Sequence, residues 1–304
     1  MRELAAACIS ALLLVAPTFA SAKEPMKLVV LGTGTPNPDP NRSGPALAII
    51  KDGHSYIIDA GPGLVRRAAA AEKKYGISSL SARNLETAFL THLHTDHTVG
   101  LPDLIFTSWV LEREVPLKLF GPPGADDMVQ HLHQAYKEDI NIRLNGLEPA
   151  TPRGYKVDVS IIHEPGVILK TGNLKVEAFR VIHGSWPHSF GYVFADGEKK
   201  IVISGDARPS PLLVKAAMGA DILVHEVYSV QGYKTRPKEW QTYHASFHTS
   251  AHQLAAIAKE TKPKLLVLYH QLYWGFSDKD LIQEIYDAGY TGTVISARDL
   301  DVFE

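Results

Sequence analysis

The feature that most constrains the fold of this chain is the segment 91–97, which reads THLHTDH. It places four potential metal ligands directly after an apolar run, at residues 92, 94, 96 and 97. Neutral imidazole and carboxylate groups suit Zn²⁺ and similar divalent ions. Because side chains alternate along an extended chain, His92 and His94 point the same way. A turn at Thr95 would direct Asp96 and His97 to a second position, so the segment predicts a metal site at a strand end.

Three further candidate ligands follow apolar or β-branched runs elsewhere in the chain. They are His183, Asp206 and His270, and Gly205 before Asp206 allows a close approach of the backbone. Each of them alone is equally consistent with a surface or a core residue. Because one loop cannot complete two sites, we expect these three side chains to converge on the loop at 91–97.

Residues 1–22 are predicted to be a secretory signal peptide. A short apolar run ends at Pro17, and Ala20-Ser21-Ala22 forms a cleavage signal. The run is shorter than the ~20 apolar residues that a membrane span needs. Cleavage would place a mature chain starting at Lys23 in the periplasm or outside the cell, with no membrane anchor. It would also remove Cys8, the only cysteine, so a metal site must use histidine and carboxylate.

The mature chain, 23–304, is predicted to form one domain. Hairpin-rich stretches alternate with strand–helix units in both halves, with a turn signal at Asp52-Gly53 and helices expected at 64–74 and 126–139. No composition break divides the residues after the leader. This order favours two mixed sheets packed face to face with helices outside.

These motifs resemble those of the metallo-β-lactamase-fold hydrolases, in the branch that contains ribonuclease Z and the bacterial zinc arylsulfatases. The resemblance covers essentially all of the mature chain. It rests on LGTGTP at 31–36, the loop at 91–97, FGPPG at 120–124, SGDARPS at 204–210, and the histidines at 183, 225, 248 and 270. It implies an α/β (α+β) fold, a four-layer αβ/βα sandwich of two mixed β-sheets with outer helices.

The same resemblance implies a two-metal site. One ion would be held by His92, His94 and His183, the other by Asp96, His97 and His270, with Asp206 bridging both. The ions would be two Zn²⁺, with Mn²⁺ or iron as alternatives, and a hydroxide between them would be the nucleophile. Asp96 would also orient this hydroxide. His248 would donate a proton or hydrogen bond to the transition state, and Glu226 would hold His248 in the required tautomer.

The leader and the motifs together predict an exported dinuclear hydrolase of sulfate or phosphate esters, similar to the arylsulfatases. Its expected substrate is a small anionic ester. A net charge of −2 argues against a broadly basic nucleic-acid binder, so no nucleic acid is expected as a partner. The resemblance suggests a homodimer.

Three alternatives stay open. The first is a ribonuclease Z-like endoribonuclease that processes tRNA 3′ ends. The family enzyme grips tRNA with a long basic arm inserted before the bridging aspartate, but only 22 residues separate His183 from Asp206 here. The second is a lactonase or β-lactamase using the same metals, and the third is a non-catalytic metal-binding relative.

Several other residues are ambiguous in sequence. Of the aromatic residues that could line a pocket, Trp109 is expected in the core and Trp186, beside His183, near the substrate; Tyr228 and Trp274 are further candidates. The roles of His188 and Arg208 stay open between substrate contact and structure. Asp59 and Asp103 are expected to make structural hydrogen bonds near the loop.

Overall fold

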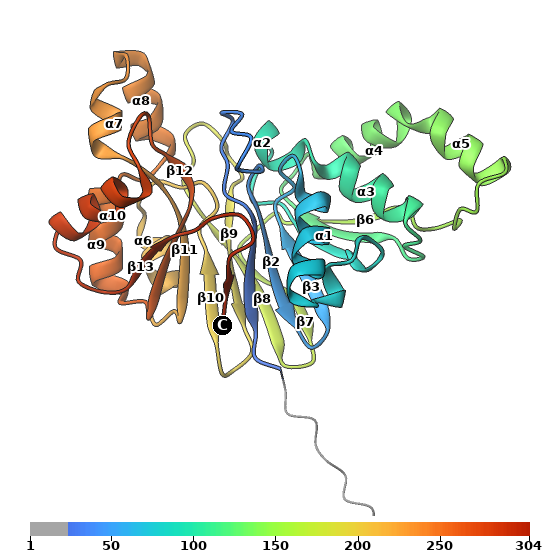
Figure 1. The fold of residues 1–304 in the computed structure, drawn as a ribbon, viewed down its shortest axis with the longest axis horizontal. Helices are drawn as coiled ribbons and strands as arrows, with labels where there is room; N and C mark the ends of the chain where they lie inside the picture. The colour runs from blue at the N-terminus through green and yellow to red at the C-terminus, as the bar shows by residue number, and fades with distance from the viewer. Residues whose placement is uncertain (1–23) are drawn as a thin grey trace, which may run out of the picture.

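The computed structural model describes residues 24–304. The predicted signal peptide at 1–22 and the start of the mature chain at Lys23 therefore lie outside the described residues. Between 24 and 304, two seven-stranded sheets pack face to face and helices cover their outer faces (Figure 1). This arrangement confirms the predicted four-layer sandwich of two mixed sheets.

The first sheet is built mainly from the N-terminal half of the chain. Its strand order is β14-β1-β2-β3-β4-β5-β6, with antiparallel pairing from β14 to β3 and parallel pairing from β3 to β6. The strands are β1 Lys27–Gly32, β2 Ala46–Lys51, β3 His54–Ile58, β4 Thr87–Phe89, β5 Leu117–Gly121, β6 Val157–Ile161 and β14 Val302–Phe303.

The second sheet repeats this plan with the C-terminal half. Its order is β13-β12-β11-β10-β9-β8-β7, with parallel pairing from β13 to β10 and antiparallel pairing from β10 to β7. The strands are β7 Gly166–Thr171, β8 Leu174–Arg180, β9 Phe190–Ala195, β10 Lys200–Ile203, β11 Ile222–Tyr228, β12 Leu265–Leu272 and β13 Val294–Ser296.

The helices fall into two groups, one for each sheet, together with two short 3₁₀ turns. Helices of the first half are α1 Leu64–Tyr75, α2 Thr95–Thr98, α3 Leu101–Val110, α4 Ala125–Ala135 and α5 Lys137–Asn145, with 3₁₀ turns η1 Ser78–Leu80 and η2 Ala82–Asn84. Helices of the second half are α6 Pro211–Ala217, α7 Val230–Lys234, α8 Lys238–Phe247, α9 Ala251–Thr261 and α10 Asp278–Asp287.

Strand β1 shows why the apolar runs in the sequence are continuous. Leu28 and Val30 pack in the layer between the two sheets, whereas Val29 and Leu31 pack under the helices of the first half. Successive side chains of a strand point to opposite faces, so a strand buried on both faces must be apolar throughout. A third apolar cluster lies between the second sheet and α6, α9 and α10. The three clusters hold the sheets rigidly enough to position side chains at their ends.

The sequence-based boundaries differ from the structure in two places. The helix predicted at 126–139 is two helices, α4 and α5, which are broken at Tyr136. In addition, β7, α7 and α8 were not predicted. The segment 230–247 mixes polar and aromatic side chains without a conventional apolar stripe, so its helical pattern is weak.

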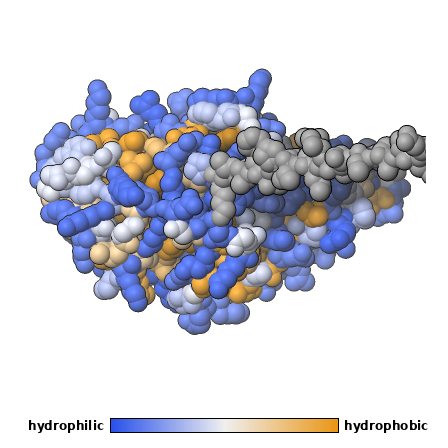
Figure 2. All heavy atoms as spheres, turned by 90° about the horizontal axis from the view of Figure 1, so that it is seen from below, coloured by the Kyte–Doolittle hydropathy of each residue, from blue (hydrophilic) through white to orange (hydrophobic). Residues whose placement is uncertain are grey.

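On the face shown in Figure 2, hydrophilic side chains surround smaller groups of hydrophobic ones. Within residues 24–304, no helix is long and apolar enough to cross a membrane.

Candidate metal centre

Candidate ligands from both sheets converge at the ends of their strands. The segment 91–97 follows β4 of the first sheet, and α2 begins at Thr95, so the predicted turn is the start of a short helix. His183 follows β8 and Asp206 follows β10 in the second sheet. We refer to the seven candidate ligands as the ligand cluster: His92, His94, Asp96, His97, His183, Asp206 and His270. The structure brings all of them together, as the sequence predicted.

His270 reaches the cluster through an irregularity in β12. Glu226 of β11 pairs with Tyr269, but the next residue, Val227, pairs with Gln271, which leaves His270 without a partner in this ladder. The backbone of His270 has a left-handed φ of 47°. An inserted residue of this kind re-aims a side chain out of the regular alternation of a strand. The ligand therefore lies within the strand and not after its end.

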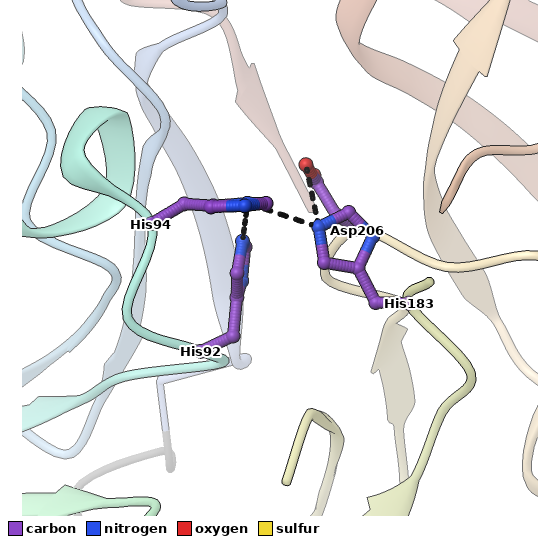
Figure 3. Close-up of side chains that lie close together, drawn as sticks. All are labelled: His92, His94, His183 and Asp206. Atoms are coloured by element: carbon purple, nitrogen blue, oxygen red, sulfur yellow. Dashed lines mark hydrogen bonds and ion pairs between the residues drawn. The ribbon is translucent and has the colours of Figure 1, made fainter. Parts of the chain in front are cut away.

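Four residues form the first part of the cluster (Figure 3). Nδ1 of His94 lies 2.9 Å from Nε2 of His92 and 3.0 Å from Nε2 of His183. Oδ2 of Asp206 lies 3.9 Å from Nε2 of His183. The donor atoms of these residues all lie within 4.8 Å of one another. Ligand atoms around a tetrahedral zinc ion are about 3.3 Å apart, given bonds of about 2.0–2.1 Å, so the spacing fits one ion.

The remaining residues form a second part that shares Asp206. Nε2 of His97 and Nε2 of His270 each lie 3.4 Å from Oδ2 of Asp206, and Nε2 of His270 lies 3.2 Å from Oδ2 of Asp96. Oδ1 of Asp206 and Nε2 of His97 are buried without a hydrogen-bond partner among the described residues. Buried polar atoms are normally satisfied. Unpartnered donors from imidazole and carboxylate groups therefore fit a second divalent ion.

Outer hydrogen bonds fix the rings that face inward. Nδ1–H of His97 donates to Asp59 at 2.8 Å, and Asp59 also accepts from the backbone N–H and the hydroxyl of Thr91. Nδ1 of His92 contacts the same hydroxyl at 2.9 Å. Nδ1–H of His183 donates to the carbonyl of Phe247 at 2.8 Å. Such contacts leave Nε2 of each ring free to bind a cation. The structural role expected for Asp59 is confirmed.

The electrostatics divide the histidines into two kinds. Burial lowers the pKa of His92 well below its usual value and that of His183 to about 3, so both rings are neutral near pH 7. Burial acts the same way on His97, but the charges of Asp206, Asp59 and Asp96 outweigh it and raise the pKa of His97 well above the usual value. In the absence of a cation, a proton on His97 therefore balances part of the negative charge of the surrounding carboxylates.

Asp206 is the most strongly stabilised anion of the cluster. Its burial alone would raise its pKa, but the charges of His270 and His97 hold the pKa well below the usual range. A buried carboxylate that remains ionised, and that lies between two groups of imidazoles, is suited to contact two cations at once.

His248 and Glu226 adjoin the cluster and are both buried. Nδ1 of His248 lies 3.9 Å from Oδ2 of Asp206 and 3.5 Å from Oε2 of Glu226. Oε1 of Glu226 accepts from the backbone N–H groups of Ala207 and Thr249, at 3.3 and 2.9 Å. One carboxylate thus ties the segment that carries Asp206 to the segment that carries His248. Both residues therefore lie next to the ligand cluster, within 4 Å of Asp206 or of each other.

Burial dominates the acid–base properties of this pair. It lowers the pKa of His248 to about 4. It raises the pKa of Glu226 well above the usual value, and the neighbouring charge of Asp206 adds to the effect. At neutral pH the imidazole is therefore neutral, and burial favours the protonated form of Glu226.

A cavity of about 320 Å³ opens onto the cluster. Asp96, Asp206, His248 and His270 line its floor. Aromatic side chains from α8 and from the loop after β12 line one side, and we call these residues the aromatic wall: Trp240, Tyr243, His244 and Trp274. Arg236, from the turn between α7 and α8, also lines the cavity. Its volume is at the small end of the range for ligand sites.

The sequence missed most of the aromatic wall. Only Trp274 was a candidate, because α8 itself was not predicted. The signal was nevertheless present: aromatic and histidine side chains recur with helical spacing at residues 240, 243, 244, 247 and 248.

The other ambiguous residues lie away from the cavity. Trp109 is buried in the core, as expected, and Tyr228 is buried behind Trp274. Arg208 is exposed and does not line the cavity, and His188 contacts Arg180.

Trp186 does not line the cavity either; it contacts His94. Its indole Nε1–H donates to Nε2 of His94 at 2.7 Å. An indole N–H can only donate, so the proton of a neutral His94 ring lies on Nδ1, the atom that faces His92 and His183. A cation bound at Nδ1 would displace this proton.

Comparisons with known proteins identify the family and the fold. Residues 54–271 match the model of the beta-lactamase superfamily domain. The ribonuclease Z of Mycobacterium avium (strain 104) is 31% identical over 249 residues, which cover 81% of this chain and 85% of that protein. The ribonuclease Z of Mycobacterium sp. (strain KMS) is 30% identical over 249 residues, which cover 81% of this chain and 84% of that protein.

Solved structures share the architecture at lower identity. The short form of human tRNase Z has a TM-score of 0.67 and 23% identity, covering 91% of this chain and 98% of that one. The metallo-beta-lactamase fold protein YhfI from Bacillus subtilis has a TM-score of 0.69 and 19% identity, with the same shares covered.

These relatives contradict one prediction and weaken another. The expected partner, a small anionic ester with no nucleic acid, is wrong, because the similar curated proteins are ribonucleases. They also favour the ribonuclease Z alternative over the arylsulfatase-like one. The error has a physical cause: the ligand motif suits hydroxide attack on any ester, and net charge averages over the whole surface without describing the cavity.

Proposed function

Because the chain belongs to the metallo-β-lactamase superfamily, in its ribonuclease Z branch, we propose that it hydrolyses phosphodiester bonds of RNA. The chain is a metal-dependent hydrolase of ester bonds, as its ribonuclease Z relatives are. We propose two zinc ions as the metals, since imidazole and carboxylate donors suit that ion. Bound in the cluster, the ions would supply positive charge to the scissile phosphate and lower the pKa of water.

The observation that carries this proposal is the sharing of Asp206 between two groups of imidazoles at the floor of an open cavity. His92, His94 and His183 would hold one ion, and Asp96, His97 and His270 the other, with Asp206 between them. Asp96 also lines the cavity, so its carboxylate can accept a proton from the attacking water. A substrate phosphate entering the cavity would meet this floor first.

His248 and Glu226 complete the chemistry on the protein side. The unpartnered Oε2 of Glu226 lies 3.5 Å from Nδ1 of His248. In its protonated form, which burial favours, Glu226 would donate to this nitrogen and so favour the tautomer with the proton on Nε2. That imidazole lines the cavity and can donate a hydrogen bond to the phosphate as charge develops. The role of Glu226 is to position His248.

The segment between His183 and Asp206 bears on how RNA is held. It contains only β9, β10 and their short connections, and no long arm is inserted there. RNA must therefore be bound by surfaces next to the cavity. The cavity above the cluster has a volume of only about 320 Å³, which supports a substrate whose scissile bond lies in an unpaired segment, such as a single-stranded 3′ end.

A substrate panel tests the proposal. The purified chain, loaded with zinc or manganese, is assayed on RNA with a single-stranded 3′ extension, on DNA of the same sequence, and on aryl sulfate, lactone and cephalosporin. We expect cleavage of the RNA that EDTA abolishes and that zinc or manganese restores. A protein that carries two metals per chain and hydrolyses another substrate class, but no RNA, would contradict the proposal.

We also propose that residues 1–22 direct export, so that the RNA is met outside the cytoplasm. The support is the short apolar run followed by the Ala20-Ser21-Ala22 signal. Cell fractionation and N-terminal sequencing test it. A periplasmic protein that begins at Lys23 supports export, and a cytoplasmic protein that retains the leader contradicts it.

A further inference from the structure

Helix α8 stands beside the mouth of the cavity and carries a row of rings. Figure 1 shows α7 and α8 projecting above the second sheet at the top left. On α8 and its end the spacing i, i+3, i+4, i+7, i+8 places side chains on one face of a helix. The residues at this spacing are Trp240, Tyr243, His244, Phe247 and His248. The last of them is the imidazole next to Asp206.

The rings form a continuous path from solvent to the ligand cluster. Trp240 and His244 are nearly parallel, with an interplanar angle of 26° and centroids 5.8 Å apart. The ring of His244 lies 4.5 Å from Trp274 and 5.6 Å from His248. His244 is buried, whereas Trp240 is 46% exposed. The path therefore ends in an open aromatic face at the cavity mouth.

Packing alone does not account for this exposed indole. Tryptophan and tyrosine gain stability by burying their rings, and half-exposed rings that gather at one cavity are typical of binding surfaces. Trp274, which also contacts His244, is held in a left-handed backbone conformation with φ of 48°. A bulky residue in this conformation is uncommon and costs backbone energy, which a functional position can explain.

Arg236 adds a positive charge to the same side of the cavity. Its guanidinium lies over the ring of Trp274, 5.9 Å from the centroid. Its Nε is buried and has no hydrogen-bond partner among the described residues. A guanidinium that lines the cavity beside aromatic rings is suited to a phosphate that accompanies a stacked base.

We propose that the aromatic wall is a stacking platform for one unpaired base next to the scissile phosphate, and that Arg236 binds the adjoining phosphate of the same strand. This inference rests on the proposed ribonuclease function and names the form of RNA that the site takes. A base in a duplex has both faces covered by its neighbours, so only an unpaired base can stack on Trp240. Stacking on aromatic side chains tolerates any base, so the platform selects single strands without selecting sequence.

Kinetics on two matched RNA substrates test the platform. An intact RNA oligonucleotide is compared with one that carries an abasic nucleotide next to the cleaved bond. Because either side of this bond could face the wall, the abasic nucleotide is placed first on one side and then on the other. For the intact RNA, we expect W240A to raise KM about tenfold with kcat little changed, and W240F to restore most of the loss. For the abasic RNA, W240A should change KM by less than about twofold, because the stacking partner is already missing.

A matched control separates stacking from a general loss of surface aromatics. Tyr286, on α10, is 40% exposed and does not line the cavity, so Y286A should leave both substrates unaffected. R236Q should weaken binding of the intact and abasic RNAs alike, and should reduce the slope of log affinity against log salt by about one.

A binding measurement gives a readout that does not depend on turnover. An oligonucleotide with a methylphosphonate at the cleaved position is titrated into the wild type and into W240F, and tryptophan fluorescence is recorded. Stacking predicts quenching in the wild type that is largely absent in W240F and with the abasic oligonucleotide.

The outcomes distinguish this inference from the proposed function. If the wild type cleaves RNA but W240A keeps the wild-type KM on the intact RNA, the platform is wrong and the ribonuclease proposal stands. If the wild type cleaves no RNA, the proposed function fails, and the fluorescence titration decides on the platform: the expected quenching supports it and its absence overturns it.

Discussion

The ligand cluster and the aromatic wall border the same cavity but are built in different ways. The ligands follow strands of two packed sheets or, for His270, lie within one, and most of them are buried. The wall comes from α8 and a loop, and Trp240 at its edge is nearly half exposed. We infer a division of labour: the rigid cluster performs chemistry that many esters could share, whereas the wall determines which molecule reaches it.

The largest expected effect comes from breaking the cluster. D206A removes the carboxylate shared by both groups of imidazoles, so both metals should be lost and turnover should fall by about 10⁴-fold or more. Metal analysis and initial rates on RNA measure this. H131A, which changes an exposed histidine on α4, is the control and should behave as the wild type. A variant that lacks Asp206 and retains two metals would contradict the bridging role.

The next effect should separate catalysis from metal binding. H248A is expected to lower kcat about 10²–10³-fold while metal content stays near two per chain, since His248 lies beside the ligands and is not one of them. E226Q should cost less, about 10–100-fold, because Glu226 acts through His248. Loss of both metals in H248A would show that His248 belongs to the cluster. Equal losses in the two variants would argue against a purely positioning role for Glu226.

A smaller effect should appear where the cluster meets the wall. Gly184 follows His183 with a left-handed φ of 54°, and a Cβ there would lie 2.1 Å from the ring of Phe247, at the end of α8. G184A should therefore cost about 1–3 kcal/mol through overpacking. The control is G172A, with φ of 55° and nothing within 4 Å of its Cβ. Urea unfolding compares the two.

Equal free energies of unfolding for G184A and G172A would mean that α8 moves to accommodate the added Cβ without loss of stability. In that case the wall would be mechanically independent of the cluster. Unequal stability, together with a raised KM for RNA in G184A, would show that the two regions are coupled through Phe247.

The smallest expected effect concerns pH. Burial lowers the pKa of His183 to about 3 and the pKa of His225, His244 and His248 to about 4. Between about pH 6.5 and pH 4 these histidines are protonated in the unfolded chain but remain neutral in the folded protein. The metal-free protein should therefore lose stability as pH falls. Burial also lowers the pKa of His92 and His94, which brings the histidines that favour this trend to six. The charged carboxylates raise the pKa of His97 and His270, and burial raises that of Glu226, so three groups oppose the trend.

Thermal unfolding of the EDTA-treated protein at pH 7 and pH 5 measures this dependence. H244F, in the wall, should reduce the proton uptake on unfolding by about one. A metal-free protein that is more stable at pH 5 than at pH 7 would contradict the assignment.

Local sequence patterns were sufficient to predict the ligand cluster. The aromatic wall could not be predicted in this way, because it depends on how distant segments pack against each other. The loop at 91–97 carries its ligands contiguously, and His183 and Asp206 follow recognisable strands, so topology alone brings them together. The orientation of Trp186 depends on the tight turn at Gly184, which sequence does not reveal. Trp240 could not be assigned because α8 was not predicted. The prediction of helices used aliphatic periodicity, whereas the face that α8 turns toward the cavity is aromatic.

The bulge at His270 has a consequence for how this chain can evolve. A non-glycine residue in a left-handed conformation costs about 1 kcal/mol or more relative to glycine. A mutant with glycine at this position would relieve this backbone cost, but it would also lose a buried imidazole beside Asp96 and Asp206 and, with it, a candidate metal ligand. Selection for an unstrained backbone and selection for activity therefore act in opposite directions at position 270. The histidine present there is the residue that selection for activity would retain.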